Sequence, residues 1–362
     1  MCTGALTALA GSPTQAWVCS LTCMSTPDLV TLRPQGLYCA AGDFYIDPWR
    51  PVHRAVVTHG HADHARAGHS ALLCAARGLP VLRTRLGEQQ ALQGLAWGER
   101  LRLGEVTVSL HPASHVLGAA QVRIEGPGGT WVVSGDYRVA SDASCDPFEP
   151  VPCDVFITES TFGMPIYRWQ PQAAVMDEIL QWWQATAREG AACVLYTYAL
   201  GKAQRVLLGL QAAGAFEAGA GVGPVFAHSA VARLNEAYAQ AGIALPACPT
   251  LPEQLPPGSL VLAPQSLQGS RWMQRQRPLL REGTVSGWMT TRGARRRQAG
   301  VRGFVLSDHA DWPGLLQAIG GTGAQRVIVT HGQQHFMARW LIEQGLQGEV
   351  LQTAFDARDA DV

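Results

Sequence analysis

The sequence is poor in lysine: Lys202 is the only lysine among the 28 basic residues of a 362-residue chain. Because arginine supplies nearly all of the positive charge, arginine content alone does not indicate a phosphate-binding surface. Acidic residues also number 28, so the formal net charge is zero. This balance neither favours nor excludes nucleic acid as a partner, since a local basic patch can bind phosphate on a neutral protein.

Three further features are missing. No run of eighteen apolar residues is present, which disfavours a membrane-spanning helix. The nine cysteines include no Cys-x-x-Cys pair, which disfavours a disulfide framework and indicates a reduced, cytoplasmic protein. The first 23 residues lack the basic start and the apolar centre of a signal peptide. We expect residues 1–26 to be disordered or to come from a mis-assigned start.

Metal-binding residue types are concentrated in one short stretch. His59, His61, Asp63 and His64 follow the apolar residues 55–57, which predicts a loop at the end of a buried strand. The first two histidines can bind one ion, and Asp63 with His64 can bind a second. Imidazole and carboxylate together suit zinc, with manganese or iron as alternatives at the more oxygen-rich position. A core histidine or a helix cap explains one isolated histidine but not this cluster.

Other polar residues lie where further apolar strands are expected to end: Asp47, Asp136, Glu159, His309 and His331. Asp47 can orient metal-binding histidines, although Asp-Pro is also an ordinary turn. One carboxylate at Asp136 can bridge two ions. Glu159 is a site candidate or a helix cap. His115, three residues before a glycine, can supply a third imidazole to the first ion.

Alternating strands and helices predict an α/β fold, with a second α/β unit over residues 166–299. We expect helices over residues 65–76, 173–188 and 228–241, and a strand over residues 79–83. The arginine-rich stretch from residue 271 to residue 302 predicts a solvated helix face or a surface that contacts phosphates. The candidates for phosphate contact are Lys202, at an expected helix start, and Arg292, Arg295, Arg296 and Arg297.

The order of these residues resembles the motifs of the metallo-β-lactamase/β-CASP nucleases. The stretch from His59 to His64, then His115 and Asp136, is similar to the second to fourth motifs of the metallo-β-lactamase fold, with Asp47 in place of the first. Motifs A, B and C of the β-CASP nucleases are similar to the segments around Glu159, His309 and His331. Residues 36–51, 198–205 and 331–341 look most like the bacterial DNA ligase-associated exonucleases, also labelled mRNA 3′-end processing factors.

This resemblance implies a four-layer αββα metallo-β-lactamase domain, residues 27–165 and 300–362, with a β-CASP α/β domain inserted at residues 166–299. It implies two divalent metal ions, zinc or alternatively manganese. The first would be held by His59, His61, His115 and Asp136, and the second by Asp63, His64, Asp136 and His331. Four residues would be catalytic: Asp63, Asp136, Glu159 and His309. Of these, His309 would donate a proton while Glu159 holds it.

The function implied is a metal-dependent phosphodiesterase, a DNA exonuclease that acts in repair on single-stranded DNA with an ATP-dependent DNA ligase and a helicase. The alternative is an RNase on the same scaffold, because a histidine at motif C, as at His331, is associated with RNA-cleaving members. A glyoxalase-like hydrolase does not need the inserted domain or the pair of Glu159 and His309. A subunit without metals is disfavoured because every ligand position is filled.

Overall fold

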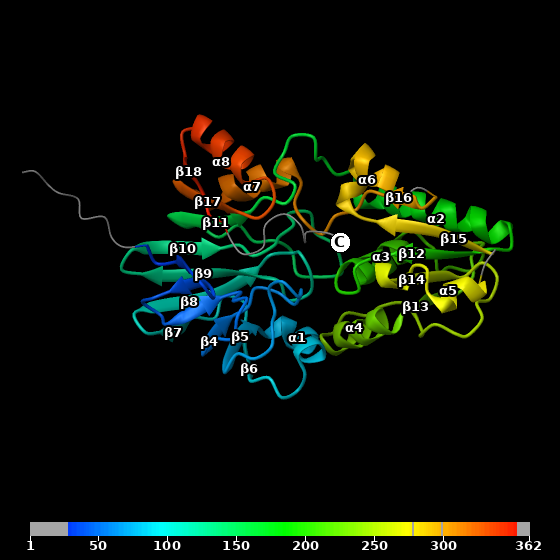
Figure 1. Ribbon diagram of the computed structural model, residues 1–362, viewed down its shortest axis with the longest axis horizontal. Helices are drawn as coiled ribbons and strands as arrows, with labels where there is room; N and C mark the ends of the chain where they lie inside the picture. Colours follow the sequence, from blue (N-terminus) through cyan, green and yellow to red (C-terminus); the bar gives the residue numbers. More distant parts are fainter. Residues whose placement is uncertain (1–27, 277–278, 298–299, 353–362) are drawn as a thin grey trace, which may run out of the picture.

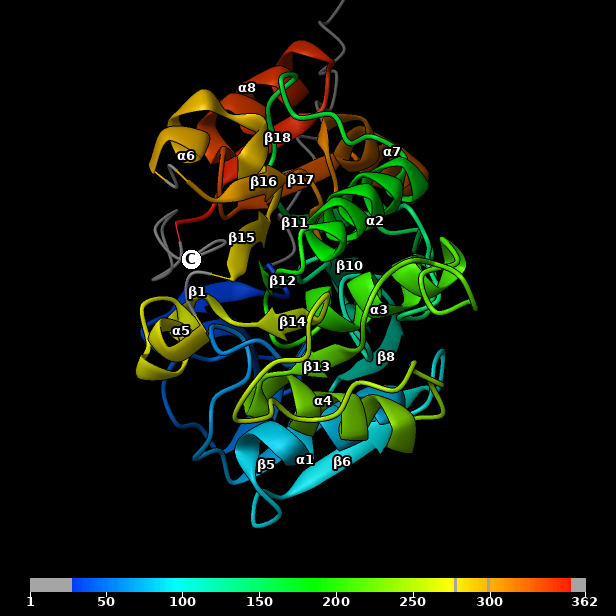
Figure 2. The same cartoon turned by 90° about the vertical axis from the view of Figure 1, so that its right-hand side faces the viewer.

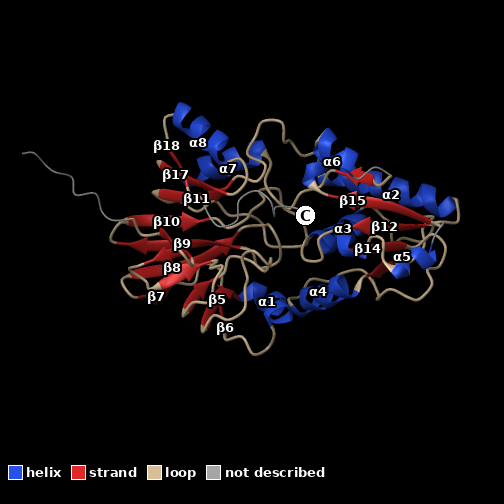
Figure 3. Cartoon of the chain, viewed as in Figure 1, coloured by secondary structure: helices blue, strands red, loops and turns tan. Residues whose placement is uncertain are grey.

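The computed structural model describes residues 28–276, 279–297 and 300–352, and within these residues it has three sheets flanked by helices (Figures 1 and 3). The predicted α/β class is confirmed. No helix in the described ranges is long and apolar enough to cross a membrane. The segment predicted to be a disordered or mis-assigned start lies outside the described residues.

The first sheet has six strands in the order β1-β2-β3-β4-β5-β6. Their bounds are β1 Thr31–Arg33, β2 Gly36–Cys39, β3 Phe44–Ile46, β4 Arg54–Val56, β5 Ala71–Ala75 and β6 Leu92–Leu95. The strands from β3 to β6 are parallel. Because parallel strands end at the same edge of a sheet, Asp47 after β3 and the histidine-rich loop after β4 lie close together.

The second sheet has seven strands in the order β18-β17-β11-β10-β9-β8-β7. Their bounds are β7 Leu101–Leu103, β8 Val106–Pro112, β9 Ala120–Gly126, β10 Gly129–Val133, β11 Val155–Glu159, β17 Arg326–Thr330 and β18 Gln347–Val350. Strand β11 is parallel to both β10 and β17. The ends of these three strands therefore bring Asp136, Glu159 and His331 to one edge of the sheet.

The first two sheets pack face to face. Their facing sides form one apolar core, to which β3 contributes Phe44 and Ile46 and β8 contributes Val106 and Val108. The other side of the second sheet packs against α7, Trp312–Thr322, and α8, Gln334–Glu343. The other side of the first sheet packs against α1, Leu79–Leu86. This burial fixes the edges at which the polar loops meet.

The third sheet is parallel throughout and has the order β13-β14-β12-β15-β16 (Figure 2). Its bounds are β12 Ala192–Tyr196, β13 Val225–Ala227, β14 Leu260–Ala263, β15 Leu280–Val285 and β16 Arg302–Phe304. The helices of this region are α2 Gln172–Arg188, α3 Lys202–Ala212, α4 Ser229–Gln240, α5 Arg271–Gln276 and α6 Arg292–Arg297. Short 3-10 turns span Ala76–Gly78, Gln265–Leu267 and Gly287–Thr290. Helices α2 and α4 confirm two predicted helices.

Two local predictions are wrong. The expected helix over residues 65–76 contains strand β5, because Leu72, Leu73 and Cys74 are buried within the sheet and a short apolar run fits either element. The expected strand over residues 79–83 belongs to α1. Pro80 lies in the first turn of that helix, where proline removes no intrahelical hydrogen bond.

Candidate metal centre

The histidine-rich loop begins directly after β4. The extended backbone continues to Val57, whose N–H donates to the carbonyl of Leu73. The loop then turns tightly, and the N–H of Ala65 donates to the carbonyl of His61 at 2.8 Å. His59 and His64 are buried, and His61 is half-buried. The strand end and the turn together direct several imidazoles toward one point.

The first predicted ligand set is brought together by the fold. His61 Nδ1 lies 3.1 Å from His59 Nε2 and 3.0 Å from His115 Nε2. Asp136 Oδ2 lies 3.5 Å from His59 Nε2 and 3.8 Å from His115 Nε2. All four residues offer ligand atoms within 4.8 Å of one another. Three imidazoles and one carboxylate form a donor set that suits a tetrahedral zinc ion.

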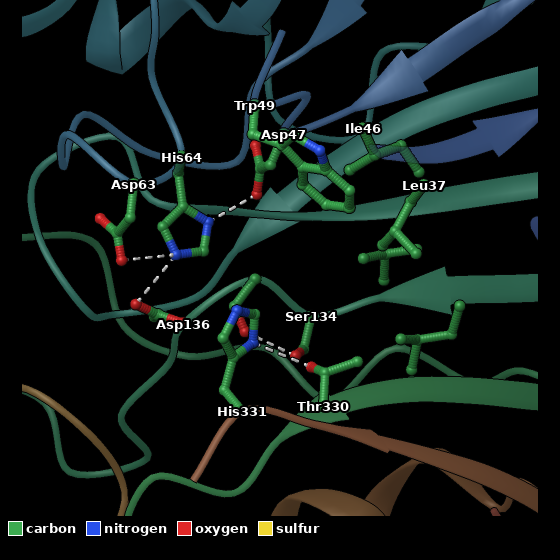
Figure 4. A pocket seen from close by; sticks show the side chains of 13 residues that line it. Leu37, Ile46, Asp47, Trp49, Asp63, His64, Ser134, Asp136, Thr330 and His331 are labelled. Carbon is green, nitrogen blue, oxygen red and sulfur yellow. Dashed lines mark hydrogen bonds and ion pairs between the residues drawn. The ribbon is translucent and has the colours of Figure 1, made fainter. Parts of the chain in front are cut away.

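The second predicted set shares Asp136 with the first. Asp136 Oδ2 also lies 3.4 Å from His64 Nε2, and that nitrogen lies 3.5 Å from Asp63 Oδ2. The ring of His331 lies farther away, with its centroid 5.9 Å from that of His64. Figure 4 shows these side chains around one cavity of about 40 Å³. A single carboxylate oxygen therefore faces both sets, as a bridging ligand would.

Asp47 holds the histidine-rich loop through Thr58 and His64, and its contact with His64 is drawn in Figure 4. One carboxylate oxygen accepts from the N–H of Thr58 at 2.7 Å. The other accepts from the Thr58 hydroxyl at 2.6 Å and lies 2.7 Å from His64 Nδ1. This contact leaves His64 Nε2 to face Asp63 and Asp136. The arrangement is the one expected for a carboxylate that orients a metal-binding imidazole.

Burial sets the charge of the histidines. It lowers the pKa of His59 and His115 well below the ordinary value, and it lowers the pKa of His61 as well. Neutral imidazoles are the form that binds metals. Burial would also lower the pKa of His64, but the carboxylates of Asp136, Asp63 and Asp47 raise it well above the ordinary value. Three carboxylates around one imidazole make this position attractive to a cation.

A second pair of side chains lies beside Asp136. His309 Nδ1 lies 2.9 and 2.8 Å from the two carboxylate oxygens of Glu159. Glu159 also accepts from the N–H of Tyr137 at 2.8 Å and from the hydroxyl of Thr161 at 2.5 Å. Ligand atoms of Asp136, Glu159 and His309 lie within 4.8 Å of one another. Glu159 therefore holds the ring of His309 through Nδ1.

Backbone strain is concentrated at the site. In the described ranges, four non-glycine residues have a positive φ, with values between 44° and 58°. They are Asp43, Asp47, Ser114 and His331. Three of them are Asp47, His331 and the residue before His115. Such conformations are costly for residues with a Cβ and are typical of functional sites.

Comparisons with known proteins agree with this geometry. No family model matches the chain. A protein of Opitutus terrae named "Probable DNA ligase" is 32% identical over 314 residues, which cover 86% of this chain and 30% of that protein. A protein of Thermus thermophilus named as a ribonuclease is 28% identical over 191 residues, 45% of this chain and 44% of that protein. The endoribonuclease YSH1 of Saccharomyces cerevisiae is 34% identical over 126 residues, 33% of this chain and 16% of that protein.

The similarity to these relatives supports the metallo-β-lactamase/β-CASP family for this chain. The predicted resemblance is thereby confirmed. The chain spans less than half of the length of each of these three relatives. Two of the three are named as ribonucleases, which agrees with the expectation of a hydrolytic nuclease.

In this chain, the basic residues predicted to contact phosphate lie in different surroundings. Lys202 is fully buried at the start of α3, and its Nζ lies 3.6 Å from Asp308 Oδ2. Arg292 and Arg296 are exposed on α6. The side chains of Arg295 and Arg297 lie outside what the structure describes. Phosphate contacts by these five residues stay predictions, and for Lys202 the structure provides a buried acidic neighbour instead.

Sequence reasoning missed several residues that hold the site. Thr58 links Asp47 to the histidine-rich loop, and the carbonyl of Asp308 accepts from His115 Nδ1 at 2.8 Å. Arg205 donates to Asp308 Oδ1 at 3.2 Å. Thr58 directly precedes the first histidine, which was an available signal. A backbone carbonyl has no signature in a sequence, so the contact of Asp308 could not be found in this way.

Proposed function

We propose that the protein is a metal-dependent nuclease, and that it is a DNA exonuclease acting in repair with an ATP-dependent DNA ligase and a helicase. The observation that carries the nuclease proposal is the position of Asp136, whose carboxylate faces both ligand sets and the pair of Glu159 and His309. The relative named "Probable DNA ligase" supports the link to a ligase, because it contains the matching segment in a much longer chain.

We propose the four-layer αββα arrangement for the part of the chain that carries the ligands. The shared core of the first two sheets, with α1 outside one and α7 and α8 outside the other, supports it. The domain bounds proposed are 27–165 and 300–362, with the β-CASP domain at 166–299. The third sheet and its helices support an insertion, and the last strand of that sheet, β16 at Arg302–Phe304, lies just past the proposed bound at residue 299.

Two divalent metal ions, zinc or manganese, fit the donor sets. His59, His61, His115 and Asp136 would hold the first, and Asp63, His64, Asp136 and His331 the second. Bound ions would supply Lewis-acid stabilisation of the charge that develops on a phosphoryl group. The neutral state of the buried imidazoles and the three carboxylates around His64 support both positions.

The remaining residues act on the substrate and on its protons. His309 donates a proton to the leaving oxygen, while Glu159 holds the ring and stabilises its charged form. Asp47 orients His64. The exposed arginines of α6, with Arg295 and Arg297, would follow the phosphates of a single strand. The six described free cysteines support a reduced, cytoplasmic location.

The second candidate function is an RNase on the same scaffold. Two observations favour it: a histidine, His331, stands at motif C, and the relatives from Thermus thermophilus and Saccharomyces cerevisiae are named as ribonucleases. We nevertheless place DNA first, because the match to the relative named "Probable DNA ligase" covers 86% of this chain.

Matched 5′-labelled single-stranded DNA and RNA separate the two functions. Purified protein is incubated with each substrate and added Zn²⁺ or Mn²⁺, with the His309→Ala variant alongside. Metal-dependent loss of DNA that is absent in the variant supports the exonuclease, and the product ladder gives its direction. Preferential loss of RNA assigns the protein to RNA processing. If the protein cleaves neither substrate, the nuclease proposal is wrong.

A further inference from the structure

The outer nitrogen of His61 is held by a residue from another part of the chain. Its Nδ1 faces the other ligand atoms of the first set, and its Nε2 lies 3.3 Å from the carbonyl oxygen of Leu200. Leu200 lies between β12 and α3, both of which belong to the region of the third sheet. With Nε2 donating to this carbonyl, Nδ1 is left as the ligand nitrogen.

His115 is held in the opposite sense by the segment between β16 and α7. Its Nε2 faces the first set, and its Nδ1 donates to the carbonyl of Asp308 at 2.8 Å. The carboxylate of Asp308 lies 3.6 Å from Lys202 Nζ and 3.2 Å from Arg205 Nη1. Arg205 also donates to the carbonyl of Ser307. Two cations on the first turn of α3 therefore fix the backbone that orients this imidazole.

Gly201 allows the close approach that these contacts need. Its φ is +88°, and a Cβ at this position would lie 2.2 Å from Cγ1 of Val116, the neighbour of His115. A larger residue would have to push α3 away from the ligand loop. The segment from Leu200 to Arg205 thus meets the centre through a carbonyl, a glycine and two buried cations.

We propose that the segment Leu200 to Arg205, called here the α3 clamp, positions His61 and His115 for metal binding. The proposal rests on the proposed metal centre and gives it a dependence on the docking of α3. Lys202, Arg205 and Asp308 act as positioning residues, because they reach the ligand atoms only through other groups. Burying a charge is costly unless it is paired, and here Asp308 pairs with both cations.

The first test uses the metal-free wild-type protein with ¹⁵N-labelled histidine. Long-range ¹H–¹⁵N correlation spectra report which ring nitrogen carries the proton, and the His61→Asn and His115→Asn variants assign the two signals. We expect opposite tautomers: protonated Nε2 in His61 and protonated Nδ1 in His115. The same tautomer in both rings, or rapid averaging between tautomers in either, overturns the clamp without any need for a folded clamp variant.

The second test measures Zn²⁺ affinity by competition with a chromophoric chelator in the wild type, Lys202→Met and Gly201→Ala. Loss of a supporting contact of this kind typically weakens metal binding about 10- to 100-fold, and we expect a loss in that range. The control is Arg77→Met, since Arg77 donates to the carbonyl of Ala241 in a contact between the 3-10 turn before α1 and the end of α4, away from the ligand rings. We expect its affinity to match the wild type.

The outcomes separate the clamp from the proposed function. If the wild type binds Zn²⁺ and Lys202→Met binds it equally well, the clamp is wrong and the metal centre stands. An equal loss in Arg77→Met also overturns the clamp, because any loosening of α3 and α4 would then suffice. A raised KM for nucleic acid with unchanged Zn²⁺ affinity in Lys202→Met would assign this lysine to phosphate binding instead. Absence of Zn²⁺ binding in the wild type contradicts the metal centre itself.

Discussion

His309 and Glu159 form a two-oxygen contact: Nδ1 of the imidazole lies within 2.9 Å of both carboxylate oxygens. The two residues are 150 positions apart in the chain, and both are buried. A carboxylate in this position fixes the orientation of the ring. We propose that the pair supplies a proton beside Asp136.

This contact predicts the behaviour of His309→Ala. Removal of a general acid typically lowers kcat about 10²- to 10⁴-fold, and we expect that loss with an unchanged metal content. A phosphodiester with a p-nitrophenolate leaving group needs no proton, so its hydrolysis should fall much less. Steady-state kinetics on both substrates check this. Equal losses on the two substrates would show that His309 does not act as the acid.

Replacing Asp136 tests the shared ligand. We expect Asp136→Ala to abolish turnover and to leave the fold intact, because the carboxylate lies at a strand end and not in the apolar core. Nuclease assays, metal analysis and thermal unfolding are the measurements. Asp177→Ala, on the exposed face of α2, is the matched control and should keep full activity. Retained nuclease activity in Asp136→Ala would contradict the proposed site.

Asp47 contacts a ligand of the second set directly, and it reaches His59 of the first set only through the Thr58 hydroxyl, which lies 3.1 Å from His59 Nδ1. Asp47→Asn should weaken the second metal position by about 10- to 100-fold, because His64 and Thr58 both lose a charged acceptor. The first position should keep its ion. Titration with Zn²⁺, followed by metal analysis, then gives one tightly bound ion where the wild type has two. Loss of both ions together would contradict the division into two sets.

The metal-free protein should be less stable in mild acid. Burial lowers the pKa of His59 and His115, so below about pH 6.5 the unfolded chain binds protons that the folded chain does not. Each such histidine removes up to about 1.4 kcal/mol of stability per pH unit. His64 has a raised pKa in the folded protein. Its protonation therefore stabilises the fold fully below about pH 6.5, and this stabilisation is lost as the pH rises through the pKa of His64 in the folded protein.

Urea unfolding of chelator-treated protein at pH 7, 6 and 5 measures this dependence. The free energy of unfolding should fall with pH, since more histidines have a lowered pKa than a raised one. His59→Asn should show a smaller slope than the wild type. A flat profile in the wild type would mean that these imidazoles are already protonated in the folded protein.

The sequence predicted which residues would lie close together, because parallel strands of any sequence end at the same edge of a sheet. Residues such as Asp136 and Glu159 follow apolar strands, and parallel strands end at one edge. The α/β class and the resemblance to this family were predicted on the same residues and are confirmed. The metal and catalytic roles of the individual residues stay predictions.

Other features depend on tertiary contacts that a sequence does not encode locally. The apolar run at Leu72 to Cys74 fits a helix or a strand, and only its place between β4 and β6 decides. Lys202 at a helix start suggested a contact with phosphate, whereas Asp308, about a hundred residues later, provides a buried acidic neighbour. Carbonyl groups such as that of Leu200 are present at every residue and give no signal.

The order of strands in the second sheet has a consequence for synthesis. β11 pairs with β10 on one side and with β17 on the other, yet β17 is made roughly 170 residues later. At about 5 to 20 residues per second, the ribosome leaves the apolar edge of β11 unpaired for roughly 10 to 30 seconds. During that time the whole region of the third sheet is produced and can fold first. We expect a nascent chain halted before residue 326 to expose an unpaired strand edge, which is prone to aggregation.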